Sequence, residues 1–541
     1  MLIRKFLSIF CLLTISSACW PADTLLVRSP SGEICVKVWM ERQLKYSISY
    51  HDRSILLPSS IDMLLVNKQD LSYNNAIRSA KVKKINEQII SPIPEKRKII
   101  PDIYSLLSVS FRRPYIVEFR VYDDGVAYRI ITLFKDSIYV ENEVAEFSFP
   151  GKPSAYFPEV QKRPDADIFH TSFEQEYLLR SLDTIPIGAV AYNPVLVVPD
   201  RNPKIAITES DLEDYPGMFL EGTGSSVLKG IFAGYPLEEQ ATEGLYRQNK
   251  VTGRAPFLAK TSGSRRFPWR VLIIAEEDKD LPSNDLVYRL ASPSGIQDVS
   301  WIKPGNLTDE WIIDLNLFNV PFRAGLNTAS YKYYIDFAKR FGFDRIMMDA
   351  GWSDRVTPGH DVTLAFTRML AGGFDYEPGL LNNATIKGTR PISGVVTSPG
   401  TRCHQLSMFV IYDSPMQIFS GNPSEGMLEP QFMNLLGNIP TTWDETVIID
   451  AKVGEYIVTA RLKDNNWFVA GMTDWSEREI IIKFGFLDDG IYKATICRDG
   501  INADRYAADY VIEEDLHIRK NDETKIHLAP GGGFLIRLDR F

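Results

Sequence analysis

The chain has 541 residues, of which 45% are hydrophobic and 24% are charged, and these proportions are ordinary for a globular protein. It carries 60 lysine and arginine residues against 69 aspartate and glutamate residues, so its formal net charge is −9. An acidic chain without a basic stripe excludes nucleic acid as its main partner, and the length accommodates about two to four domains.

Residues 1–19 have the composition of a secretory signal peptide. Arg4 and Lys5 precede the apolar run Phe6–Ile15, and small residues follow before Cys19. This run is too short to span a bilayer, and we expect no transmembrane segment later in the chain. The sequence therefore predicts an exported protein, periplasmic or associated with the outer membrane. We expect simple cleavage near this point, and lipid attachment at Cys19 is the alternative.

The remaining cysteines are few and widely separated. Cys35, Cys403 and Cys497 do not have the spacing of a metal site, and three is an odd number for disulfides. We expect buried free thiols.

Residues 25–297 alternate between short apolar strands and turns rich in Gly, Pro and Asp. In one example, Tyr115–Tyr122 and Val126–Ile131 flank an Asp-Asp-Gly turn, which predicts a hairpin. Many such strands predict an N-terminal β-sandwich domain.

Two charged stretches stand out in this domain. Glu209–Gly217 concentrates four acidic residues directly after a strand, where they could ligate a hard cation or form a solvated loop. Arg265–Arg270 is the densest basic stretch, and exposed arginines at the edge of a sheet explain it better than a phosphate site.

Residues 301–440 have an α/β pattern. The apolar run Trp311–Phe322 predicts a strand, and an apolar face recurs at helical spacing behind the N-cap Thr328. Ile346–Met348 then predicts a strand buried on both faces. Asp349 and Trp352 follow its carboxyl end, as active-site residues do in an α/β barrel. An ordinary βαβ unit whose aspartate caps the next helix is the alternative.

Residues 441–541 return to closely spaced short strands. Examples are Glu455–Ala460 and Gly533–Leu538. This pattern predicts a small C-terminal β-sandwich domain. Before it, the apolar stretch His404–Tyr412 predicts a helix that Pro415 ends.

A long, ordered series of motifs runs through the three parts and resembles glycoside hydrolase family 97, the calcium-dependent exo-acting α-glucosidases and α-galactosidases exported by polysaccharide-degrading bacteria. The motifs are FRVYDDGVAYRI (Phe119–Ile130), AITESDLEDYPGMFL (Ala206–Leu220), SWIKPG (Ser300–Gly305), AGLNTASYKYYIDFA (Ala324–Ala338), MDAGWSD (Met348–Asp354), FTRMLAGGFDYEPG (Phe366–Gly379), GTRCHQLSMFVIYDSPMQ (Gly400–Gln417) and IPTTWDET (Ile439–Thr446).

The resemblance implies a β-super-sandwich, a (β/α)₈ barrel and a C-terminal β-sandwich. It implies oligosaccharide substrates, and Asp349 and Trp352 as substrate-binding residues. It also implies a calcium ion held by several glutamates, of which Glu209 is the one in the first domain.

The same resemblance shows where this chain departs from the family. A (β/α)₈ barrel needs about 200 to 250 residues, whereas 301–440 contains 140 (440 minus 300). Asp354 runs directly into Arg355, and we infer an internal deletion of roughly 100 to 160 residues at this point. In the family that block carries the catalytic carboxylates and the other calcium glutamates, so no catalytic residue can be assigned.

The sequence therefore predicts an α-glycosidase by descent, with an incomplete barrel and no hydrolytic activity. A non-catalytic carbohydrate-binding protein or a degraded remnant is the alternative. Glucose or galactose specificity, inverting or retaining stereochemistry and oligomeric state stay open.

Overall fold

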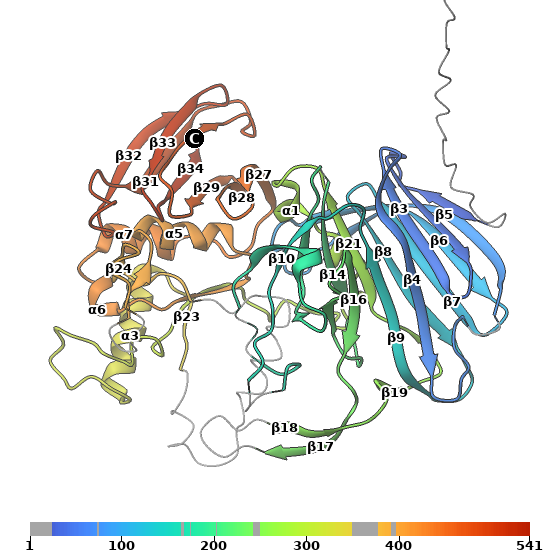
Figure 1. Ribbon diagram of the computed structural model, residues 1–541. Helices are drawn as coiled ribbons and strands as arrows, with labels where there is room; N and C mark the ends of the chain where they lie inside the picture. Colours follow the sequence, from blue (N-terminus) through green and yellow to red (C-terminus); the bar gives the residue numbers. More distant parts are fainter. Residues whose placement is uncertain are drawn as a thin grey trace, which may run out of the picture.

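The computed structural model describes residues 24–72, 75–163, 167–171, 173, 175–201, 203–241, 249–348, 377–390 and 396–541. The chain forms three parts in sequence order (Figure 1): a large β-sandwich, a small α/β part and a second β-sandwich. The predicted fold class is confirmed. In the part of the chain that the structure describes, no helix has the length and apolar character needed to cross a membrane.

Two large antiparallel sheets form the N-terminal sandwich. The first has nine strands in the order β1 (Leu25–Arg28), β2 (Ile34–Met40), β3 (Leu44–Tyr50), β4 (Arg53–Leu65), β9 (Ile138–Ser148), β16 (Val227–Phe232), β15 (Met218–Gly222) and β12 (Val190–Ala191), with β19 (Ala259–Thr261) also on β9. The second has ten strands in the order β11 (Leu178–Ser181), β10 (Ser154–Phe157), β13 (Val195–Val198), β14 (Lys204–Ser210), β21 (Trp269–Ala275), β8 (Gly125–Leu133), β7 (Tyr115–Tyr122), β6 (Ile99–Phe111) and β5 (Ile77–Ile90), with β20 (Ser264–Arg266) also on β8.

The predicted hairpin of this domain is confirmed as β7 and β8. The two strands pair antiparallel, with Tyr122 opposite Gly125 at the turn. Val117, Phe119 and Val121 are fully buried in the core between the sheets, as their alternation in the sequence predicts. Outside the two sheets lie the 3₁₀ turn η1 (Leu182–Thr184), the hairpin β17 (Pro236–Ala241) and β18 (Asn249–Arg254), and the short helices α1 (Asp280–Ser283) and α2 (Leu286–Leu290).

The α/β part is small. Its elements are β22 (Gly305–Thr308), α3 (Thr328–Phe341), β23 (Arg345–Ile346), β24 (Asn383–Ala384), β25 (Ser398–Pro399), α5 (Arg402–Ile411), β26 (Met416–Phe419), α6 (Pro423–Gly426) and α7 (Pro430–Gly437). The helix α3 is confirmed, but its N-cap is Asn327 and not Thr328. The Asn327 side chain accepts hydrogen bonds from the backbone N–H groups of Ala329 and Ser330.

The parallel sheet of this part shows how a barrel closes. Its order is β23-β22-β26, so the last parallel strand lies beside the first. In a (β/α)₈ barrel the eighth strand pairs with the first in this way. Among the described residues this sheet has three strands, so β22 has a neighbour on both sides and β23 and β26 form its edges. We conclude that the sheet is the seam of an incomplete barrel.

The C-terminal sandwich packs on α5 (Figure 1). Its main sheet has the order β27 (Glu445–Lys452), β28 (Tyr456–Lys463), β29 (Asn466–Thr473), β34 (Gly533–Arg540), β31 (Tyr492–Asp499) and β32 (Tyr510–Ile518), and the pair β30 (Arg478–Lys483) and β33 (Glu523–Leu528) covers it. The inner face between them holds Val469, Ile482 and Phe534. The predicted helix before this domain is confirmed as α5.

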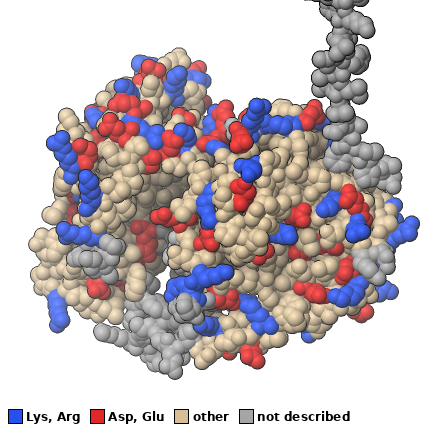
Figure 2. Space-filling view, viewed as in Figure 1, with Lys and Arg blue, Asp and Glu red and all other residues tan. Residues whose placement is uncertain are grey.

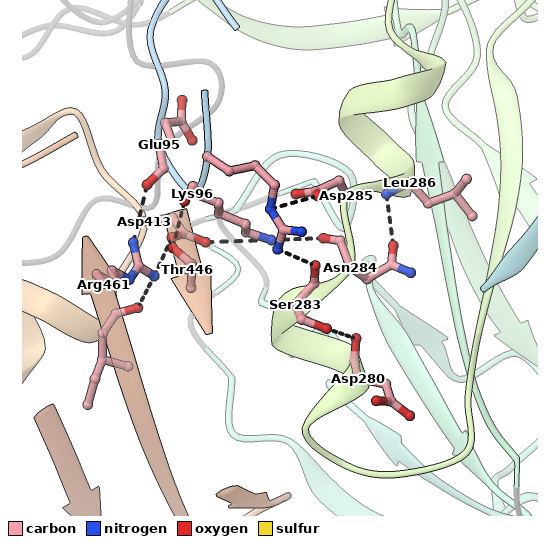
Figure 3. A network of polar contacts seen from close by, with 12 residues as sticks. Glu95, Lys96, Asp280, Ser283, Asn284, Asp285, Leu286, Asp413, Thr446 and Arg461 are labelled. Atoms are coloured by element: carbon pink, nitrogen blue, oxygen red, sulfur yellow. Dashed lines mark hydrogen bonds and ion pairs between the residues drawn. The ribbon is translucent and has the colours of Figure 1, made fainter. Parts of the chain in front are cut away.

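The tip of the β5–β6 hairpin joins the parts of the chain to each other (Figure 3). In this tip, residues 91–98, the Lys96 ammonium donates to the Asn284 carbonyl oxygen at 2.9 Å, and its nitrogen lies 3.6 Å from the Asp413 carboxylate. Asp413 follows α5 and also accepts from Arg461 of β28 at 2.6 Å. A single loop therefore connects the N-terminal sandwich, the α/β part and the C-terminal sandwich.

Further bonds hold the same loop. Arg97 pairs with Asp285 at 3.1 Å, and the Thr446 hydroxyl donates to the Lys96 carbonyl oxygen at 2.6 Å. Glu95 lies beside these charges (Figure 3). Burial, helped by the Asp413 carboxylate and opposed by Lys96 and Arg461, raises the pKa of Glu95 to about 7.

Glu95→Gln should remove a pH dependence of stability. The folded chain keeps a proton on Glu95 at pH values where the unfolded chain, with the ordinary value of 4.5, has released it. Stability should therefore fall as the pH rises from about 4.5 to about 7. In thermal scans, the melting temperature of E95Q should equal that of the wild type at about pH 4 and exceed it at about pH 8. Glu87→Gln, exposed on the same hairpin, is the control. A difference between E95Q and wild type that is the same at both pH values would contradict the prediction.

Candidate functional site

Two acidic residues follow β22 at the carboxyl end of the barrel seam. Asp309 and Glu310 are both buried. The Asp309 N–H donates to the Phe419 carbonyl oxygen at the end of β26, which fixes the two strand ends side by side. Active sites of α/β barrels are built at this end of the strands, so Asp309 and Glu310 are the described carboxylates best placed for a site.

Side chains of α3 cover these carboxylates. The Tyr331 hydroxyl donates to Glu310 Oε1 at 2.8 Å. Asp309 Oδ2 accepts from the backbone N–H of Trp311, which lies before α3, at 3.2 Å. Tyr334 is buried next to them, and its burial, together with Glu310 and Asp309, raises its pKa. Both acids therefore lie among hydrogen-bond donors in a largely water-free environment.

The apolar pattern of the sequence did not point to these two residues. It predicted the first strand over Trp311–Phe322, after both of them, and this prediction is wrong. Residues 311–315 form turns, and Ile313, Leu315 and Leu317 are apolar because they pack with Tyr334. The real strand is a four-residue stretch, Gly-Asn-Leu-Thr, whose polar residues hide it. The signal that could have found it is the pair of acids directly after a strand-length segment.

The predicted substrate-binding residues Asp349 and Trp352 lie outside the described residues. The strand before them is described and is shorter than predicted, Arg345–Ile346. Its predicted burial on both faces is wrong, because Ile346 and Met347 are half-buried and Met348 is 41% exposed. A strand at the edge of an open sheet lacks the neighbour that would cover it.

Glu209 lies on β14 in the N-terminal sandwich and is held in place by nitrogen donors. Its Oε2 accepts from Arg270 Nη1 at 2.6 Å, and its Oε1 accepts from the Met218 N–H at 2.9 Å. Burial raises the pKa of Glu209, and Arg270 opposes that rise. The buried Arg270 guanidinium also binds Glu143, through Nε at 2.7 Å and Nη2 at 2.8 Å. Glu143, Arg270 and Glu209 therefore form a buried carboxylate–guanidinium–carboxylate triad.

The hydrogen bonds of Glu209 bear on the calcium ion that the family resemblance implies. Calcium takes about six to eight oxygen ligands, and both Glu209 oxygens already accept N–H groups. Throughout the described ranges, no group of three or more His, Cys, Asp or Glu side chains could hold a metal ion. In this structure Glu209 is paired with Arg270, and its role as a calcium ligand stays a prediction.

The two charged stretches found in the sequence bind each other. Arg265 donates to the carbonyl oxygens of Asp214 and Glu213, at 3.1 and 2.8 Å, and Arg270 binds Glu209. The acidic loop and the basic stretch thus supply each other's hydrogen-bond and ion-pair partners. Both signs of charge are also interspersed over the face of the molecule seen in Figure 2.

A β-sandwich, a barrel seam with carboxylates at its carboxyl end and a second β-sandwich together define a multidomain protein of sandwich–barrel–sandwich architecture. Three family models match in this order: Glycosyl-hydrolase 97 N-terminal over 27–293, Glycoside hydrolase 97 over 310–375, and Glycosyl-hydrolase 97 C-terminal, oligomerisation, over 442–539. The chain belongs to glycoside hydrolase family 97.

Individual relatives agree with this assignment. The chain is 30% identical to a "Retaining alpha-galactosidase" of Bacteroides thetaiotaomicron over 639 residues, covering 94% of this chain and 96% of the relative. It is similar in fold to a family 97 enzyme from Pseudoalteromonas sp. strain K8 solved with acarbose, with a TM-score of 0.78, 20% identity and coverage of 96% of this chain and 100% of that one. A β-arabinopyranosidase structure has a TM-score of 0.76 at 16% identity, with coverage of 95% and 100%.

The length of the first alignment bears on the barrel. It spans 639 positions, whereas this chain has 541 residues, so at least 98 positions (639 minus 541) have no residue of this chain opposite them. This number agrees with the deletion of roughly 100 to 160 residues inferred from the size of a barrel.

Glu143→Gln should destabilise the N-terminal sandwich more than Glu209→Gln. Glu143 binds the buried Arg270 through two hydrogen bonds and Glu209 binds it through one, so E143Q disrupts more of the hydrogen bonding that holds the guanidinium. We expect a loss of about 3 kcal/mol or more for E143Q and a smaller loss for E209Q. Urea denaturation followed by circular dichroism measures both.

Glu141→Gln is the matched control, because Glu141 lies on the same strand in an exposed pair with Lys68. It should cost about 0.5 kcal/mol or less. Equal losses for E143Q and E141Q would show that the triad does not stabilise the sandwich.

Proposed function

We propose that this chain is a glycosidase of family 97 by descent, that its substrate class is terminal α-galactosides or α-glucosides, and that it does not hydrolyse them. The observation that carries the proposal is the length of the barrel region. From β22 to the end of α7, residues 305–437, there are 133 residues (437 minus 304), against about 200 to 250 in a (β/α)₈ barrel.

The chemistry of glycoside hydrolysis supports the same proposal. It requires two carboxyl groups on either side of the scissile bond, about 5 to 9.5 Å apart, one of them held protonated. Asp309 and Glu310 are neighbours on one strand end, and Glu310 is held by Tyr331. The family resemblance places the nucleophile or base and the acid in the block that this chain lacks.

The substrate class comes from the relatives. The Bacteroides relative is described as a retaining α-galactosidase, and the Pseudoalteromonas structure was solved with acarbose. We propose that a sugar ring contacts Asp349 and Trp352, which follow β23 in the sequence. The function that remains is then sugar binding without bond cleavage.

We further propose that calcium has no role in this chain. The observation that supports this is the Arg270 guanidinium, which supplies the positive charge for Glu209. We propose that residues 1–19 direct export of the chain. This proposal holds with or without lipid attachment at Cys19.

Purified chain should release no p-nitrophenol from p-nitrophenyl α-galactoside or α-glucoside above the buffer rate, because no described carboxyl pair can act as acid and base. The assay is run with millimolar calcium and again with a chelator, and a family member with a complete barrel serves as the positive control. Clear turnover would refute the loss of activity.

Titration calorimetry with galactose and glucose completes the test. Binding that Trp352→Ala removes and Trp301→Ala keeps would support a sugar site beside the seam, because Trp301 is an exposed indole before β22. Absence of binding to either sugar would leave a chain without carbohydrate function.

A further inference from the structure

Two cysteines that are far apart in the sequence meet at the contact between α5 and the C-terminal sandwich. Cys403 lies in the first turn of α5 and Cys497 lies on β31, 94 residues later. Their sulfur atoms are 3.8 Å apart, and neither side chain is exposed. The prediction of buried free thiols is confirmed in this structure, but the pairing of two of them could not be read from their spacing.

The backbone on both sides of this pair is held firmly. The Thr401 hydroxyl, two residues before Cys403, donates to Asp499 Oδ1, two residues after Cys497, at 2.6 Å. The Thr401 N–H donates to the Gly531 carbonyl oxygen at 2.8 Å. A Cβ atom at Gly533 would lie 2.7 Å from the Cys403 carbonyl oxygen, so the helix approaches the sheet as closely as glycine permits. The two sulfur atoms are therefore kept facing each other by contacts that do not involve them.

The surroundings of the pair are apolar. Leu406, Phe468 and Leu535 belong to the same buried cluster as both cysteines. Burial raises the pKa of the Cys403 thiol, and the neighbouring Cys497 raises it further. The described residues include no third ligand near the two thiols that would make them a metal site.

Cys35 differs from this pair. It lies alone on β2 in the N-terminal sandwich, and burial raises its pKa as well. Cys403 and Cys497 are the described cysteines with a second thiol within reach.

We propose that Cys403 and Cys497 form a disulfide that ties the incomplete barrel to the C-terminal sandwich. The sulfur atoms are 3.8 Å apart and must approach by about 1.8 Å to reach the bonded distance of about 2.05 Å. The bond would close a loop of 94 residues, and cross-links of long loops restrict the unfolded chain most. It would stabilise the helix that connects the open sheet to the second sandwich. This proposal rests on export to an oxidising compartment and not on sugar binding.

The reaction is thiol–disulfide exchange with a disulfide donor, either a protein dithiol oxidase or oxidised glutathione. The thiolate of one cysteine attacks the donor disulfide, and a mixed disulfide forms as one donor sulfur leaves. The thiolate of the second cysteine then attacks the protein sulfur of that bond and releases the other donor sulfur. Two protein thiols lose two protons and two electrons, and the donor is reduced to two thiols. Because both sulfur atoms are buried in the folded chain, the exchange belongs to folding, before the sandwich closes over α5.

The chain from Trp20 onward is secreted into a bacterial periplasm and purified with a thiol-blocking reagent present during denaturation. Peptide mapping without reduction should recover the peptides of Cys403 and Cys497 linked to each other, and only Cys35 should carry the blocking group. The intact protein should weigh two hydrogens less than the fully reduced chain. The control C35S should keep the link, and C403A and C497A should each lose it.

Recovery of the wild-type chain with Cys403 and Cys497 both blocked would overturn the proposal, as would a link to Cys35. A second measurement does not depend on how the variants fold. Reduction with dithiothreitol should lower the melting temperature of the wild type and leave that of the C403A/C497A variant unchanged. An equal effect on both would refute a stabilising role.

Discussion

Closure of the barrel is the constraint on which the rest of this structure depends. A parallel strand is stable when both of its edges are hydrogen-bonded and both of its faces are covered, and a closed barrel provides this for every strand. In this chain β22 has neighbours on both sides, whereas among the described residues β23 and β26 have one each. Met348, just after β23, is exposed, in agreement with a sheet in which no further described strand pairs with β23.

The α/β part is therefore stabilised by its neighbours more than by its own sheet. The buried face of α5 packs on the C-terminal sandwich, and the Thr401–Asp499 bond fixes the start of that helix. The tip of the β5–β6 hairpin holds the end of α5 through Lys96 and Asp413. These contacts come from elements on both sides of the deletion, so they survive the loss of the strands between. They explain how an incomplete barrel can keep its seam.

The sequence predicts those parts of the fold that depend on local periodicity. The alternation of Val117, Phe119 and Val121 and the capped helix ending at Gly342 were recognisable because burial and spacing agree there. β22 was not recognisable, because four residues with two polar side chains carry no periodic signal. The ion pair of Glu209 could not be predicted either. The family resemblance implies a metal ligand at this position, and only the fold brings Arg270 from another strand to within 2.6 Å of it.

Amide hydrogen exchange along the three parallel strands tests the central claim most directly. An open seam predicts slow exchange in β22 and much faster exchange in β23 and β26, because no described strand pairs with their outer edges. The strands β7 and β29 serve as protected references in the two sandwiches. Protection of β23 and β26 equal to that of β22 would mean that other strands pair with them. That result would contradict the account of an incomplete barrel.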